Sequence, residues 1–153
     1  MRQPKYKSDL IPQVDGVVQD DATELKTYDN ESLNSIIFDP PFLFRNRKSE
    51  NSDKISKRFS YFKSFDELLD MYDKSLQACF NKLRKGGYLF FKCQDMTDGK
   101  FYCTHYHVIN IAERAGFTLK DIAIKSSNKK LQRDAVQQNC LAKTHSYWIV
   151  LKK

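Results

Sequence analysis

Apolar and polar residues alternate along the chain in a way that predicts strands separated by helices. The run from Leu33 to Phe38 ends in consecutive apolar residues and is typical of a fully buried parallel strand. From Ser64 to Leu83, leucines and aromatic residues recur every three or four positions, as on the buried face of an amphipathic helix. Ser64 and Glu67 form a capping box that begins this helix, and Gly86 is expected to end it.

Further strands and a second helix complete the predicted sheet. Residues 88–92 are expected to form a second buried strand, which the first helix joins to the first strand by a right-handed crossover, so that the two run parallel. A helix is expected over about residues 102–115, followed by strands at 117–124 and 146–151. No strong helix pattern separates the last two strands, which favours an antiparallel pair at the edge. The pattern therefore predicts an α/β fold with a mostly parallel sheet and an antiparallel edge pair.

Polar segments lie between these elements. Residues 1–13 are interpreted as an arm, and residues 44–61 and 126–144 as long basic loops, within a single domain spanning 1–153. Long loops in compact domains are usually functional, and we expect these to contact nucleic acid; a solvated insertion without a partner is the alternative for 44–61. The expected contacts are Arg45, Arg47, Lys48, Lys54, Lys57, Arg58, Lys129, Lys130 and Arg133.

Charge is distributed unevenly, and the asymmetry supports that expectation. The chain carries a net +7, but residues 1–43 hold 4 Lys or Arg against 8 Asp or Glu, whereas the remainder holds 22 against 11. A basic body around a polar pocket is typical of proteins that bind a phosphate backbone, although surface lysines that only keep the protein soluble are the alternative. No apolar run approaches the roughly 20 residues that cross a bilayer, the first residues do not resemble a signal peptide, and the four cysteines form no C-x-x-C pair. We expect a cytoplasmic protein with reduced thiols.

The sequence Asp39-Pro40-Pro41-Phe42 directly follows the first predicted strand. Two prolines cannot continue a strand ladder, so the backbone is expected to leave the sheet in a fixed extended shape. We expect the Asp39 carboxylate and the Pro40 carbonyl to accept hydrogen bonds from the amino group of an aromatic base, while Phe42 stacks on the base. A merely structural turn is the alternative.

This tetrapeptide resembles the signature of the S-adenosylmethionine-dependent methyltransferases that act on the ring amine of adenine or cytosine in DNA. The segments 21–32 and 83–91 are also similar to the flanks of that signature, so the resemblance extends from about Gln19 to the end. It implies a Rossmann-like methyltransferase core of reduced size, with Asp39, Pro40, Pro41 and Phe42 as catalytic residues. The glycine-rich cofactor loop of the family is missing, because no two of the five glycines form G-x-G.

Carboxylates and an amide at predicted strand ends are candidates for binding S-adenosylmethionine. Asp20 and Asp21 follow a short apolar run, and Asp21 matches the family pattern; a turn or helix cap is the alternative. Gln94 and Asp95 follow the second strand, where ligands bind in open parallel sheets, although they could equally only turn the chain.

Five cysteine and histidine residues are candidate metal ligands, but we do not expect them to bind a metal. C-x-H-x-H places its side chains on one side only in a strand, whereas a helix is predicted over this segment, and the other two residues stand alone. The residues are Cys103, His105, His107, Cys140 and His145.

These features together predict a methyltransferase that acts on the exocyclic amine of adenine or cytosine in DNA, with S-adenosylmethionine as cofactor. Since the glycine loop is absent, a homodimer or a second methyltransferase subunit is expected to complete the site. The alternatives are a relative without catalytic activity that binds nucleic acid or partners an active methyltransferase, and a basic RNA-binding module.

Overall fold

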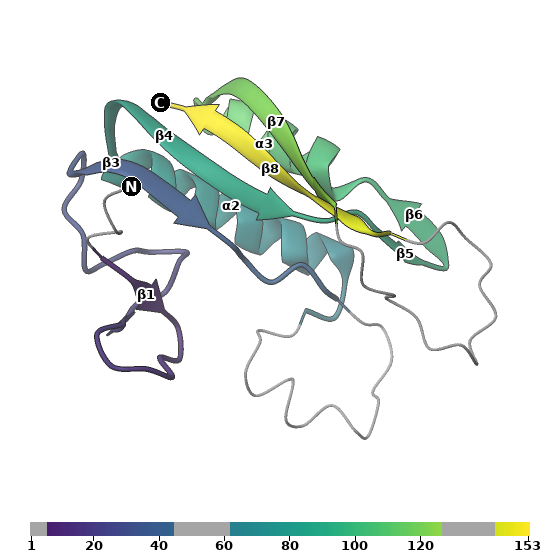
Figure 1. The fold of residues 1–153 in the computed structure, drawn as a ribbon, viewed down its shortest axis with the longest axis horizontal. Helices are drawn as coiled ribbons and strands as arrows, with labels where there is room; N and C mark the ends of the chain where they lie inside the picture. The colour runs from purple at the N-terminus through teal and green to yellow at the C-terminus, as the bar shows by residue number, and fades with distance from the viewer. Residues whose placement is uncertain (1–5, 45–61, 127–142) are drawn as a thin grey trace.

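A computed structural model describes residues 6–44, 62–126 and 143–153. The central feature is a four-stranded sheet in the order β3-β4-β8-β7, in front of two helices in Figure 1. Its strands are β3 (Leu33–Phe38), β4 (Leu83–Cys93), β7 (Thr118–Ser126) and β8 (His145–Lys152), and its helices are α2 (Phe65–Lys82) and α3 (Thr104–Arg114). Two small sheets pair β1 (Ser8–Asp9) with β2 (Val18–Gln19), and β5 (Met96–Asp98) with β6 (Lys100–Tyr102).

The sheet is mixed, and the prediction of a mostly parallel sheet was wrong. β3 and β4 pair in parallel as expected, and β7 and β8 form the expected antiparallel pair. However, β8 also pairs antiparallel with β4, because it lies between β4 and the edge strand β7. The predicted α/β class and the antiparallel edge pair are confirmed.

The core lies between the sheet and the two helices. Along β4, the alternate residues Leu89, Phe91 and Cys93 are buried, and on β8 Ile149 and Leu151 are buried beside them. Both helices lie behind the sheet in Figure 1, and their buried residues belong to the same core cluster as these side chains. Apolar residues at helical spacing on α2 close the core from that side: Leu68, Tyr72, Leu76 and Cys79.

Helix α2 begins as predicted. Ser64 is its N-cap and accepts a hydrogen bond from the Glu67 amide at 3.1 Å, while the Glu67 carboxylate accepts one from the Lys63 amide at 2.8 Å. The predicted end at Gly86 was wrong, because the helix ends at Lys82. Leu83 is already extended and pairs with Leu33 of β3, which draws the chain into the sheet before Gly86.

Strand β3 is an edge strand, and the prediction that it is fully buried was wrong. Ile36 and Phe38 pack against the core, whereas Ile37 points to the other face and is 69% exposed. The consecutive apolar residues therefore lie on both faces of the strand, but only one of these faces packs against the core. No helix in the described part of the chain is both long enough and apolar enough to cross a membrane.

Candidate functional site: the carboxyl ends of β3 and β4

The double-proline corner leaves β3 at its carboxyl end and is braced by α2. The hydroxyl of Tyr72 donates a hydrogen bond to the Pro41 carbonyl at 2.8 Å, from a side chain with no exposed surface. Burial raises the pKa of Tyr72 far above its ordinary value of 10.0, and the negative charge of Asp39 raises it further. Tyr72 therefore stays protonated and holds the corner in one position.

Asp39 points out of the core. Its side chain is 51% exposed, and its Oδ2 atom accepts a hydrogen bond from Lys92 Nζ at 2.7 Å. Phe38 pairs with Phe91 in the parallel register, so the next residue of each strand brings these two charges together. Within the described residues, no hydrogen bond reaches Oδ1, which leaves one carboxylate oxygen as an acceptor for a ligand. Pro40 is buried and Phe42 is half-buried.

Lys92 was not predicted as a functional residue. Only the strand register identifies it, since it stands one residue beyond Phe91, the partner of Phe38 in the sheet. Its ammonium group also lies 5.8 Å from the ring centroid of Trp148 on β8. Lys92 therefore fixes the orientation of Asp39 while itself resting on an aromatic ring.

Gln94 and Asp95 follow β4 at the same edge of the sheet, and each side chain bonds to another part of the chain. The side-chain amide of Gln94 donates to the His145 carbonyl at 3.0 Å. Asp95 is 4% exposed, and its carboxylate contacts His105 Nδ1 at 2.8 Å and accepts from the Tyr147 hydroxyl at 3.3 Å. The end of β4 is thereby tied to α3 and β8.

Asp20 and Asp21 are turn residues after β2. Asp20 accepts from the amides of Asp21, Lys26 and Thr27, and Asp21 accepts from the amide and hydroxyl of Thr23. Burial opposes ionisation of Asp20, but these hydrogen bonds outweigh it and lower its pKa from 3.8. The structure does not bring this turn into hydrogen-bond contact with Asp39.

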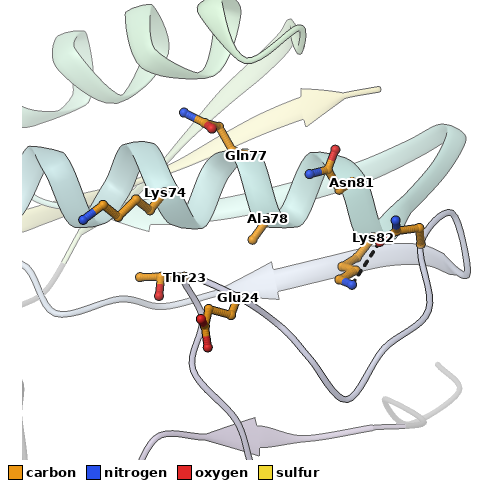
Figure 2. A pocket seen from close by; sticks show the side chains of 8 residues that line it. Thr23, Glu24, Lys74, Gln77, Ala78, Asn81 and Lys82 are labelled. Atoms are coloured by element: carbon orange, nitrogen blue, oxygen red, sulfur yellow. Dashed lines mark hydrogen bonds between the residues drawn. The ribbon is translucent and has the colours of Figure 1, made fainter.

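A polar hollow of about 250 Å³ lies between that turn and the second half of α2. Figure 2 shows Thr23 and Glu24 facing Lys74, Ala78 and Lys82 across it. None of the predicted site residues lines this hollow, and its helix wall runs towards the start of β4, whereas Asp39 lies at the end of β3. It is therefore separate from the double-proline corner.

The residues that we predicted to hold S-adenosylmethionine lie in two places, the turn after β2 and the end of β4. The carboxylates of Asp20, Asp21 and Asp95 and the amide of Gln94 already bond to their own chain. No glycine loop is present in the sequence to approach a cofactor closely. The assignment of these four residues to the cofactor, and of the double-proline corner to a base, stays a prediction.

The predicted nucleic-acid contacts cannot be placed beside this corner. All nine lie outside the described residues, in 45–61 and 127–142. Cys140, which was weighed as a metal ligand, lies there too. These contacts stay predictions that rest on charge alone.

The mixed sheet and its two helices form an α/β fold that is similar to the fold of solved DNA methylases. No family model matches the sequence, and no curated protein matches it. Among solved structures, TTHA0409 of Thermus thermophilus, assigned as a DNA modification methylase and complexed with S-adenosyl-L-methionine, is similar with a TM-score of 0.62 and 17% identity, covering 87% of this chain and 53% of that one. The PvuII DNA methyltransferase, which is cytosine-N4-specific, is similar with a TM-score of 0.60 and 15% identity, covering 88% of this chain and 47% of that one.

The predicted resemblance is confirmed as similarity in structure to DNA modification methylases. The chain spans about half the length of these proteins, with 53% and 47% of their chains covered.

Proposed function

We propose that this chain is the amine-binding part of a DNA amino-methyltransferase, which acts on the exocyclic amine of adenine or cytosine with S-adenosylmethionine as methyl donor. The observation that carries the proposal is the position of Asp39. Its carboxylate stands exposed at the carboxyl ends of β3 and β4, with Oδ2 held by Lys92 and Oδ1 open among the described residues. This is the edge of a sheet at which open α/β folds bind ligands.

Each part of the corner has a role in presenting the amine. Asp39 Oδ1 and the Pro40 carbonyl accept its hydrogen bonds, and Phe42 stacks on the base plane. The Tyr72 hydroxyl, bound to the Pro41 carbonyl at 2.8 Å, keeps these groups from shifting. Positioning of this kind supplies most of the rate in a transfer that needs little covalent chemistry from the protein.

A second polypeptide or a second copy of this chain is proposed to supply the methyl-donor site. The lack of a glycine loop in the sequence supports this part of the proposal. The same observation favours one alternative: a protein that keeps the base corner and binds DNA, or partners an active methyltransferase, without transferring a methyl group itself.

Methyl transfer from labelled S-adenosylmethionine to duplex and single-stranded DNA tests the proposal. The variant Asp39→Ala is expected to lose about 10²-fold in transfer rate, because an interaction made to the reacting group is removed. Asp98→Ala is the matched control, since Asp98 is also an exposed carboxylate but lies on β5, away from the corner. It is expected to react like the wild type.

The binding data separate the alternatives. Calorimetry with S-adenosylmethionine is expected to show weak binding by the chain alone. DNA binding without transfer, unaffected by Asp39→Ala, would favour the partner protein. Equal transfer rates for both variants, or neither transfer nor DNA binding, would contradict the proposal.

A further inference from the structure

Three potential metal ligands of different chemistry meet where β4 ends and α3 begins. Asp95, Cys103 and His105 each offer one ligand atom, and these atoms lie within 4.8 Å of one another. They come from the segment after β4 and from the residues at the start of α3, on the far side of the β5–β6 hairpin. The sequence argument against a metal assumed that Cys103 lies inside the helix. In the structure Cys103 is the N-cap residue, before the first residue of α3. The helical repeat therefore does not set the direction in which its side chain points.

We propose that Asp95, Cys103 and His105 bind one divalent transition-metal ion of the zinc type. The distance from Cys103 Sγ to His105 Nδ1 is 3.7 Å. Two ligands of one tetrahedral zinc ion, with bonds of about 2.3 Å to sulfur and about 2.0 Å to nitrogen, stand about 3.5 Å apart. The 2.8 Å contact between His105 Nδ1 and Asp95 Oδ1 would open slightly when both atoms bind the ion.

The surroundings of the cluster suit a cation. Asp95 is 4% exposed, and buried carboxylates are normally paired or bound to a metal. Its carboxylate accepts a hydrogen bond from the backbone amide of His105 at 3.2 Å and lies 2.8 Å from His105 Nδ1. The ligand atoms of Asp95 and His105 are therefore held together at the start of α3.

Residues around the three proposed ligands make contacts that are typical of the surroundings of a metal site. The Tyr147 hydroxyl donates to Asp95 Oδ2 at 3.3 Å, and His145 Nε2 lies 2.9 Å from that hydroxyl. The rings of His105 and Tyr147 stack with centroids 4.3 Å apart, which fixes the imidazole plane. Such partners orient the ligands of a metal ion. A fourth position is left for water, and the ion would secure the start of α3 to the end of β4.

Titration of the reduced, chelator-treated chain of residues 1–153 with Co²⁺ tests the site. The wild type is expected to bind one equivalent with a near-ultraviolet thiolate-to-cobalt absorption band, which Zn²⁺ abolishes by competition. Cys103→Ser should lose that band, and His105→Gln should bind at least about 10-fold more weakly. His107→Gln is the matched control, because His107 lies on the same helix outside the cluster, and it should titrate like the wild type.

Folding does not confound the result. The N-cap Cys103 makes no side-chain capping hydrogen bond, so Cys103→Ser is expected to keep the circular dichroism of the wild type. The proposal is overturned if the wild type shows no saturable binding, if the band persists in Cys103→Ser, or if His107→Gln weakens binding as much as His105→Gln. The site is independent of the proposed function, since neither methyl transfer nor DNA enters the measurement.

Discussion

One hydroxyl group holds the double-proline corner in place. Tyr72 is fully buried and donates to the Pro41 carbonyl at 2.8 Å, so Tyr72→Phe leaves that carbonyl without its partner. We expect the variant to lose about 1–2 kcal/mol in the free energy of unfolding. Urea denaturation measures this loss, with Tyr88→Phe as the control, since no hydrogen bond of the Tyr88 hydroxyl is found among the described residues. Equal losses in the two variants would mean that the corner is held by other contacts.

Asp20 couples the stability of the N-terminal turn to pH. The pKa of Asp20 is lowered from 3.8 because backbone hydrogen bonds outweigh the effect of burial. A carboxyl group with a lowered folded-state pKa stabilises the protein above its unfolded pKa, and this contribution is lost as the pH falls through the folded value. Asp20→Asn is therefore expected to be less stable than the wild type at about pH 7, with the difference shrinking towards about pH 3. Thermal denaturation at both pH values checks this, and a difference that stays constant with pH would contradict it.

At the scale of elements, two adjacent glycines in β4 differ in what a side chain at each position would meet. A Cβ atom on Gly87 would lie 2.9 Å from the Arg84 carbonyl and 3.1 Å from the Asn34 carbonyl of β3, whereas one on Gly86 would meet nothing within 4 Å. Gly86 instead has a φ of +79°, which asparagine tolerates. We expect Gly86→Asn to cost about 1 kcal/mol or less, and Gly87→Asn clearly more, because β3 and β4 must separate. Chemical denaturation measures the free energy of unfolding of the two variants. Equal losses of stability would contradict the steric argument.

Elements with a local signal were predictable from the sequence, and those that depend on distant pairing were not. The bounds of β3 and the start of α2 follow from an apolar run and a capping box. The β5–β6 hairpin was missed although Asp98-Gly99 is a strong hairpin signal, and Gly99 indeed has a φ of +71°. The insertion of β8 between β4 and β7 has no local signature, because either neighbour satisfies its hydrogen bonds equally well.

The residues of the candidate site also differ in whether a local signal places them. The position of Asp39 directly after β3 was predictable, because the double proline ends the strand. The position of Lys92 beside Asp39 was not predictable, since only the parallel register of β3 and β4 brings the two together. Cys103 and His105 were considered as ligands, but their meeting with Asp95 depends on where α3 begins, and helix ends are the least certain feature of a sequence pattern.

For the whole molecule, the uneven charge predicts how DNA binding responds to salt. Residues 44–153 carry 22 Lys or Arg against 11 Asp or Glu. Each phosphate neutralised by a basic side chain contributes about −0.9 to the slope of log affinity against log salt concentration on duplex DNA. Replacing Lys129, Lys130 and Arg133 by Gln is therefore expected to make the slope shallower by about 2 to 3. The same replacement of three exposed lysines on α2, β4 and β7, namely Lys74, Lys85 and Lys120, is the control and should change the slope by less than about 1. Fluorescence anisotropy at several salt concentrations measures both slopes, and equal changes would show that the charge acts as a whole and not through the predicted loop.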